Sequence, residues 1–323
     1  MTAAGGDFDV IVVNYNGAGV LGAALRSCLA QGVAAASCIV VDNGSRDASR
    51  TLVHEEFPGV VWLGNPCNAG FARAVNQGLR RVRARHVLIL NNDAELLPGA
   101  LSALTACFAA HPQAAVIAPR LVDAAGKPQN VAAPWPRWWR EILPRSLLKR
   151  LAPGHFGGRL AQVREDRRVA SVIGAAMALR RSALEAIGPL DEDFFFYLEE
   201  TEWCERAWRR GWQVWFCPRA SVRHHLGATA RRFEAAARIE FHRSRLTYAR
   251  KVEGFWAWVF LGLWLPLRTA VDWLAQGILV LASLGTLHSA RQRFRVYGRL
   301  LAWHLRGRPA HLGLPDKCPR LAA

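Results

Sequence analysis

Acidic residues are scarce in this chain. Its 25 Asp and Glu stand against 42 Lys and Arg, which leaves a formal net charge of +17 at pH 7. A charge balance this basic indicates an anionic partner, which can be nucleic acid, a membrane surface or a phosphorylated substrate. The basic residues are spread along the chain without a nucleic-acid recognition motif, so a nucleic-acid-binding protein is the less favoured alternative.

Other features are also missing. The seven cysteines form no CxxC pair and show no ligand-like spacing, so we expect them mostly as small core residues. The N-terminus carries no basic stretch followed by a long apolar one, which differs from a signal peptide and favours a cytosolic working face. No internal repeat or low-complexity segment is evident. The 323 residues, 51% of them hydrophobic, suffice for one large domain or two smaller ones.

Uninterrupted apolar runs of spanning length are absent as well. Residues 255–267 are thirteen uncharged residues and 273–287 are fifteen more, with Arg268 and Asp272 between them. Neither run reaches the ~20 residues of a standard spanning helix. The two runs predict a shallow hairpin or a pair of interfacial helices, with a buried helix pair as the alternative. Six Arg within residues 291–308 suit an anionic lipid surface.

Short apolar runs alternate with helical patterns over the first two thirds of the chain. We expect strands at 9–14, 37–42, 60–63, 86–90, 114–118, 172–179 and 212–216, and helices at 20–31, 47–57, 70–83, 98–110 and 182–187. The alternation predicts an α/β fold with a mainly parallel central sheet flanked by helices. Such sheets bind ligands at the carboxyl ends of their strands, where Asn14, Asp42 and Asp93 stand.

Two of these strand ends carry carboxylates with a chemical use. Asp42 can accept a hydrogen bond from a sugar hydroxyl or a base, although an Asx turn would explain it equally. Asp93 closes the sequence Asn91-Asn92-Asp93 and can hold a Mg²⁺ or Mn²⁺ that bridges a diphosphate. A polar strand-to-loop junction is its alternative. Asn68 and Gly70 suit a tight turn before a helix, which can face an anion or merely cap the helix.

Seven acids fall between Asp191 and Glu205, and no Lys or Arg interrupts them. Crowded carboxylates raise one another's pKa, which can tune a catalytic base, while an acidic helix start is the plainer explanation. If a helix begins here, Glu199 and Glu202 share one face and Glu200 points elsewhere. His224 follows the next predicted strand and can be a metal ligand or a buried structural histidine.

Taken together and in this order, the motifs resemble glycosyltransferase family 2, with the GT-A nucleotide-diphospho-sugar transferase fold. The resemblance extends from about Asp9 to Thr229 and is nearest to the rhamnosyltransferase-like branch. It rests on VIVVNYNG, IVVDNGSRD, NAGFARAVNQG, VLILNNDAEL, GPLDEDFFFYLEETEWCERAWRRGW and HHLGAT.

The resemblance implies roles for particular residues. The nucleotide pocket would involve Asn14, Asp42, Asn68, Gly70, Asn76, Asn92 and Asp93. Asn91-Asn92-Asp93 stands where the family has its DxD motif, so Asp93, together with His224 of an H-x-x-G-x-S/T pattern, would hold the Mg²⁺ or Mn²⁺. The first Asp of that motif is missing here. Glu199 and Glu200 stand at the catalytic acidic pair, with Glu200 as general base.

The resemblance also implies partners and a location. We expect an inverting glycosyltransferase that takes a sugar, rhamnose by the branch, from a nucleotide-sugar donor. The expected acceptor is polyprenyl-diphosphate-linked or a polysaccharide of the bacterial cell surface. Residues 1–250 would form the GT-A domain, and 251–323 a helical segment on the anionic cytoplasmic face of the inner membrane, peripheral or monotopic. A catalytically weak GT-A protein with a role in assembly is the alternative.

Overall fold

The computed structural model describes residues 4–142, 160, 163–225 and 234–318. The chain forms two compact units. The sheet unit takes in residues 1–135, 143–192 and 199–227, and the helical unit takes in 136–142, 193–198 and 228–323. The chain therefore passes between the units several times. The predicted boundary at residue 250 falls inside the helical unit, and the two-domain division stays a prediction.

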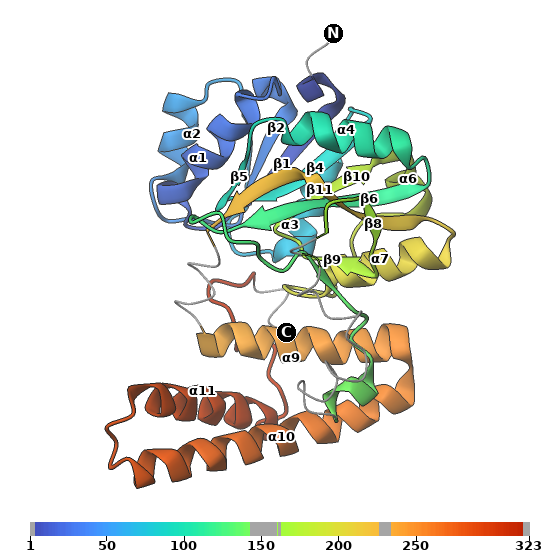
Figure 1. Ribbon diagram of the computed structural model, residues 1–323. Coiled ribbons are helices and arrows are strands. Elements are labelled where there is room, and N and C mark those ends of the chain that lie inside the picture. The colour runs from blue at the N-terminus through green and yellow to red at the C-terminus, as the bar shows by residue number, and fades with distance from the viewer. Residues whose placement is uncertain (1–3, 143–159, 161–162, 226–233, 319–323) are drawn as a thin grey trace. The chain divides into compact units, whose positions relative to one another are not determined.

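A nine-stranded sheet organises the sheet unit (Figure 1). Its strands run in the order β3-β2-β1-β4-β10-β6-β11-β5, and β8 pairs with β11. Their bounds are β1 Phe8–Asn14, β2 Cys38–Asp42, β3 Val61–Gly64, β4 His86–Asn91, β5 Ala94–Leu96, β6 Ala114–Val122, β8 Arg167–Arg168, β10 Ala176–Arg180 and β11 Gln213–His224. The first four strands of that order are parallel, as is the β6–β11 pair, while β10 and β5 are antiparallel to their neighbours. The α/β prediction is confirmed.

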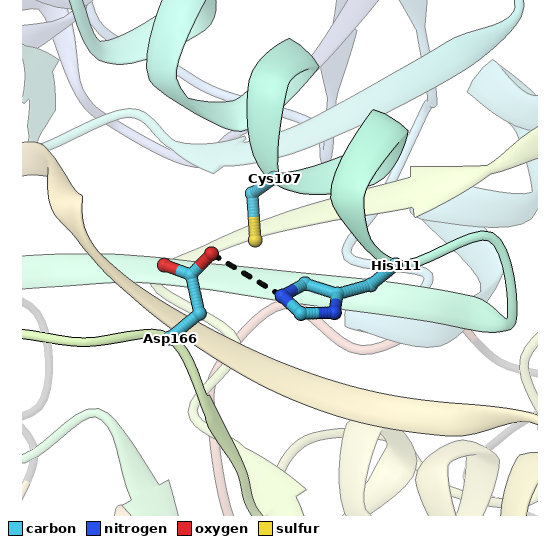
Figure 2. A group of neighbouring side chains, drawn as sticks. All are labelled: Cys107, His111 and Asp166. Atoms are coloured by element: carbon cyan, nitrogen blue, oxygen red, sulfur yellow. Dashed lines mark hydrogen bonds and ion pairs between the residues drawn. The ribbon is translucent and has the colours of Figure 1, made fainter.

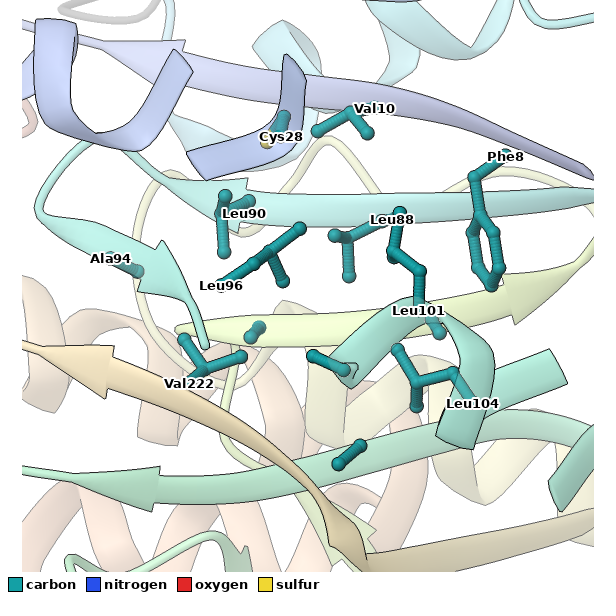
Figure 3. Packing of buried hydrophobic residues seen from close by; sticks show 14 of the residues in the cluster. Phe8, Val10, Cys28, Leu88, Leu90, Ala94, Leu96, Leu101, Leu104 and Val222 are labelled. Atoms are coloured by element: carbon teal, nitrogen blue, oxygen red, sulfur yellow. The ribbon is translucent and has the colours of Figure 1, made fainter. Parts of the chain in front are cut away.

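Helices connect these strands. They are η1 Ala4–Asp7, α1 Ala18–Leu29, η2 Ala35–Ser37, α2 Ser49–Glu56, α3 Phe71–Leu79, α4 Ala100–Ala110, α6 Arg181–Ile187 and α7 Glu199–Arg209. The strands β1, β2 and β4 are β-branched and leucine runs with almost no exposed residue, as expected for strands covered on both faces. One face packs against α1 and α4, where Val10, Leu88, Leu101 and Leu104 meet (Figure 3).

Three strands differ from the sequence prediction. Residues 172–179 do not form one strand: β9 Ser171–Val172 pairs with β7 Ala132–Ala133 in a small sheet, and β10 joins the main sheet. The last strand, β11, continues through an irregularity to His224 rather than stopping at Phe216. Residues after Asp93 form β5, which pairs with the end of β11 so that His224 lies opposite Ala94. This unpredicted pairing brings two predicted metal ligands together.

The helical unit contains η3 Trp138–Glu141, α9 Glu234–Tyr248, η6 Ala249–Glu253, α10 Phe255–Ala282 and α11 His288–Leu305. The two predicted apolar segments are wrong as separate elements, because α10 is one helix that runs through Pro266, Arg268 and Asp272. It has the length and composition of a membrane-crossing helix, and only 11% of its most apolar window is buried. Fully buried Arg245 pairs with Glu253 at 2.6 Å, which compensates the charge inside this unit.

Candidate active site

Side chains at the carboxyl ends of β1 and β2 form one hydrogen-bonded group. Asn14 is fully buried and lies opposite Asp42 in the strand pairing. Its Nδ2 donates to Asp42 Oδ1 at 2.8 Å, and its Oδ1 accepts from Asn92 Nδ2 at 2.9 Å. Asp42 also accepts from the backbone N–H of Ser45 at 2.9 Å and its hydroxyl at 2.5 Å. Since Asp42 is thus satisfied by an Asx-type turn, its carboxylate is held rigidly at the strand end.

A cavity of about 430 Å³ opens beside this group. Asp42 forms part of its wall, as predicted for a nucleotide pocket, and the aromatic Trp62 forms another part. The remaining lining residues are Gly44, Ser45, Arg46, Arg50, Gly64, Asn65 and Pro66. A planar ring, two guanidinium groups and amide edges suit a base and its phosphates. Of the cavity's lining, only Asp42 was singled out from the sequence.

The turn before α3 has the predicted shape. Gly70 has φ of +87°, a left-handed conformation that glycine adopts without strain, and its N–H donates to Asn68 Oδ1 at 3.1 Å. Its carbonyl accepts from Asn43 Nδ2 at 3.1 Å. Asn76 lies further along α3 and is used differently. Its amide donates to the Leu190 carbonyl at 2.9 Å and to Glu192 at 3.0 Å, so it fixes the start of the acidic segment.

The predicted metal ligands meet between β5 and β11. His224 Nε2 lies 3.3 Å from Asp93 Oδ1, and both side chains are almost buried. His224 Nδ1 lies 3.1 Å from Gln129 Oε1, and Gln129 Nε2 donates to the His224 carbonyl at 2.7 Å. With its proton on Nδ1, bonded to Gln129, the imidazole presents its Nε2 lone pair toward Asp93. Sequence reasoning missed Gln129, because a single glutamine in an irregular segment carries no pattern.

The neighbouring histidine takes no part in this pair. The side chain of His225 turns to the surface instead, where its Nε2 lies 2.6 Å from Glu95 Oε1. The rest of the predicted His-x-x-Gly-x-Thr pattern, Gly227 and Thr229, lies outside the described residues. One oxygen and one nitrogen donor are ligand types that suit a divalent cation such as Mn²⁺.

Helix α7 begins with the two predicted catalytic acids. Glu199 is buried and Glu200 is half-buried, and Glu202 is buried on the Glu199 side, as the helical spacing predicts. Burial, reinforced by the nearby Glu200, raises the pKa of Glu199 well above its usual range. Its Oε2 has no hydrogen-bond partner among the described residues. The raised pKa favours the protonated form of Glu199, and the less buried Glu200 is the carboxylate better placed to accept a proton from an acceptor.

The backbone before α7 is unusual. Tyr197 has φ of +74° and Leu198 of +68°, two successive non-glycine residues in the left-handed region. Such conformations cost of order 1–3 kcal/mol each and persist only where the surroundings impose them. The pair directly precedes Glu199, the first residue of α7.

A short series of contacts leads from Glu200 to β4, the strand that precedes Asp93. The Glu200 carboxyl carbon lies 3.9 Å from the position that a Cβ would occupy on Gly174. A ring carbon of Phe71, at the start of α3, lies at the same distance from that position. The residue after Gly174 accepts a hydrogen bond at 2.9 Å through its carbonyl from the N–H of Asn91. Asn91 ends β4, two residues before Asp93. The acidic pair and the Asp93 turn thus flank one stretch of chain.

The other acids of the cluster have structural partners. Glu202 is bidentate to Arg206 at 2.7 and 2.9 Å, and Glu205 pairs with Arg209 at 2.8 Å, both along α7. Glu192 pairs with Arg73 at 2.9 Å. Asp193 belongs to the helical unit, where it forms an ion pair with Lys251.

The mixed central sheet carries an Asx-turn carboxylate, an Asp–His pair and a helix that starts with acidic residues. This combination is the one expected of a GT-A nucleotide-sugar transferase fold. A family model described as "Glycosyltransferase like family 2" matches residues 5–244. The chain belongs to glycosyltransferase family 2, and it is a glycosyltransferase.

Two relatives of known activity resemble the chain. It is 26% identical over 274 residues to the N-acetylglucosaminyl-diphospho-decaprenol L-rhamnosyltransferase of Mycobacterium tuberculosis, a match covering 80% of this chain and 86% of that protein. It is also 26% identical over 240 residues to the low-salt glycan biosynthesis hexosyltransferase Agl10 of Haloferax volcanii, covering 72% of each chain.

Solved structures share the fold. The mannosyltransferase PcManGT of Pyrobaculum calidifontis, in complex with GDP-Man and Mn²⁺, has a TM-score of 0.50 at 17% identity and covers 94% of this chain and 86% of that one. GalNAc-T7 with UDP, GalNAc and Mn²⁺ has a TM-score of 0.51 at 18% identity; the match covers 67% of this chain, which spans 43% of GalNAc-T7.

Proposed function

We propose that this glycosyltransferase moves a sugar from a nucleotide-diphosphate donor to a polyprenyl-diphosphate-linked or glycan acceptor in cell-surface glycan synthesis. The observation that supports the proposal is that one sheet unit holds the Asp42 cavity, the Asp93–His224 pair and the Glu199–Glu200 pair. The rhamnosyltransferase relative supports rhamnose as the sugar and a lipid diphosphate as the acceptor anchor.

Donor binding follows from the cavity. The base would lie against Trp62, with Asp42 accepting from the ribose or the base. Arg46 and Arg50 add positive charge to the same cavity, which favours a dianionic diphosphate over a neutral sugar. Asn14 and Asn92 would support Asp42 without lining the cavity. The Asn14 side chain donates to Asp42, and the Asn92 side chain donates to Asn14.

Transfer is a single displacement that inverts the anomeric carbon. Glu200 accepts the proton of the acceptor hydroxyl as that oxygen bonds to the anomeric carbon, and the bond to the nucleotide diphosphate breaks. A protonated Glu199, which its raised pKa favours, would keep a second negative charge away from Glu200. A Mg²⁺ or Mn²⁺ held by Asp93 and His224 would offset the charge of the departing diphosphate.

The helical unit would hold the enzyme on the cytoplasmic face of the inner membrane. Exposed apolar residues recur along one face of α10 at Trp256, Leu263, Leu267, Val271, Leu274, Ile278 and Leu281. Trp138 and Trp139 are also exposed in this unit, and Trp138 packs edge-on against Phe260 of α10 at 5.0 Å. Exposed arginines of α11 at 291, 293, 295 and 299 suit anionic headgroups.

Binding of nucleotide-sugars is the decisive experiment. Calorimetry with Mn²⁺ would compare dTDP-, UDP- and GDP-sugars, and we expect one of them to bind only when the cation is present. An Arg50→Ala variant should weaken that binding, while Arg293→Ala, an exposed arginine of the helical unit, should leave it unchanged. Absence of binding by every nucleotide-sugar, in a protein whose unfolding is cooperative, would refute the transferase proposal and favour an assembly role.

A further inference from the structure

A second cluster of metal-ligating side chains lies away from the catalytic edge. Cys107 lies on the last turns of α4, and His111 follows one helical turn later, so both face the same way. Asp166 comes from the segment before β8. One ligand atom from each lies within 4.8 Å of the others. Figure 2 shows the thiol, the imidazole and the carboxylate converging on one space.

A fourth donor adjoins this group. Cys217 of β11 lies beside Cys107, close enough for the two thiols to influence each other's pKa. The Cys217 thiol donates to the Ala103 carbonyl of α4 at 3.8 Å. Both cysteines are fully buried and free. Two sulfurs, an imidazole nitrogen and a carboxylate oxygen thus come from a helix, a strand and a connecting segment.

The surroundings hold these groups in place. The His111 ring stacks on Trp215 at 3.6 Å between centroids, which fixes its plane. Asp166 Oδ2 lies 3.3 Å from His111 Nε2 and accepts from Arg219 at 2.9 Å. Asp166 Oδ1 is buried and has no hydrogen-bond partner among the described residues. A buried carboxylate oxygen without a donor is costly and suits a cation.

The spacing is close to that of a tetrahedral zinc site. Bonds of about 2.0–2.3 Å place neighbouring ligand atoms roughly 3.3–3.8 Å apart. The separations here, up to 4.8 Å for the first three ligands, need at most about 1.5 Å of closure. Charge also balances. Two thiolates and one carboxylate contribute −3, which Zn²⁺ and Arg219 offset to zero.

We propose that Cys107, His111, Asp166 and Cys217 bind a structural Zn²⁺ that joins α4 to β11. On binding, each thiol gives up its proton to solvent and forms a sulfur–zinc bond. Thiolate and imidazole ligands select zinc over Mg²⁺ and Mn²⁺, so this site and the Asp93–His224 pair would hold different ions. Cys217 precedes His224 by seven strand residues, roughly 20 Å, so the zinc would act on stability rather than on chemistry.

Co²⁺ substitution and elemental analysis test this site. The full-length protein, purified in Mg²⁺ buffer, should retain one zinc per chain. Co²⁺ added to the metal-stripped protein should give the visible bands and the near-ultraviolet thiolate charge-transfer band of a tetrahedral site. Cys217→Ser and His111→Asn should lose both signals. Cys204→Ser, which removes another buried free cysteine, should keep them.

Two further measurements separate this site from the catalytic one. Asp93→Asn should retain its zinc while losing stimulation by Mn²⁺. The midpoint of thermal unfolding should rise with added zinc in the unaltered protein and in Cys204→Ser, but not in Cys217→Ser. Zinc well below one ion per chain together with no cobalt bands, or an equal zinc content in Cys217→Ser, would overturn the proposal and leave a metal-free His111–Asp166–Arg219 ion network.

Discussion

The two units of this enzyme use hydrophobic residues in opposite ways. In the sheet unit, strands such as β1 and β4 hide nearly every apolar side chain, and charged groups occur inside in partnered sets around the site. In the helical unit, α10 turns apolar side chains outward, with Trp256 80% and Leu281 76% exposed. Burial in the first unit stabilises the fold. Exposure in the second implies an apolar partner, because a soluble surface rarely shows so long a stripe. Chemistry and location are therefore separable by mutation.

The largest loss of activity is expected from Glu200→Gln. Removing the general base should lower kcat about 10²–10⁴-fold while donor binding and vesicle binding stay unchanged. The matched variant Glu199→Gln mimics the protonated form that the raised pKa of Glu199 favours, so its kcat should stay within a few-fold of the original. Single-turnover kinetics on a water-soluble acceptor measure both. A large loss in Glu199→Gln with a small one in Glu200→Gln would exchange their roles.

Leu274→Glu combined with Ile278→Glu should break membrane association. Each side chain is more than half exposed, and transfer of such a side chain into lipid is worth about 1.5–3 kcal/mol, so partitioning onto anionic vesicles should fall at least tenfold. Activity on a water-soluble acceptor should be unchanged. Ser102→Glu with Ala106→Glu places the same charges at the same spacing on exposed positions of α4 and should leave vesicle binding intact. Equal binding by both double variants would show that α10 meets no lipid.

Gly17→Ala tests the hydrogen-bonded group behind Asp42. A Cβ there would lie 2.1 Å from Asn92 Nδ2 and 2.4 Å from Asn14 Oδ1, so their hydrogen bond must break. We expect the KM for the donor to rise about tenfold, in line with one buried hydrogen bond, while kcat changes little. Gly19→Ala, whose Cβ meets nothing within 4 Å, should leave KM unaltered. The same KM for both variants would argue that Asn14 and Asn92 do not support donor binding.

The smallest effect near neutral pH concerns the helical unit. Burial lowers the pKa of His242 to about 3 and that of His304 to about 4, and their rings lie 3.0 Å apart between Nδ1 and Nε2. The unfolded chain binds protons below about pH 6.5 while the folded one does not. Stability present above pH 6.5 is therefore lost as the pH falls toward 4, by at most about 1.4 kcal/mol per group and pH unit. Unfolding followed against pH in His242→Gln should show a shallower slope, and an unchanged slope would contradict the buried neutral pair.

The positions of several candidate site residues could be predicted, because parallel strands bring their carboxyl ends together. Asn14, Asp42 and Asp93 could be placed from strand ends alone, and helical spacing separated Glu200 from Glu199 and Glu202. The β5–β11 pairing could not be predicted, because β11 continues through Pro218 and Arg219 without an apolar pattern. Gln129 and Asp166 gain their roles only through contacts made in the folded chain. The charges of Arg268 and Asp272 led to the prediction of two separate apolar segments. Two charged residues do not end a helix of 28 residues, and α10 continues through both.

The interleaving of the two units limits how this enzyme can be shortened. Residues 193–198 are held within the helical unit by the Asp193–Lys251 ion pair and by the Ser244 hydroxyl, which donates to the Phe196 carbonyl at 2.7 Å. A truncation after residue 227 would strip these contacts from the segment that ends at Glu199. The left-handed Tyr197–Leu198 pair belongs to this segment and directly precedes α7. Polar substitutions at the exposed apolar residues of α10 would therefore alter this face while keeping the contacts of residues 193–198, which a truncation would remove.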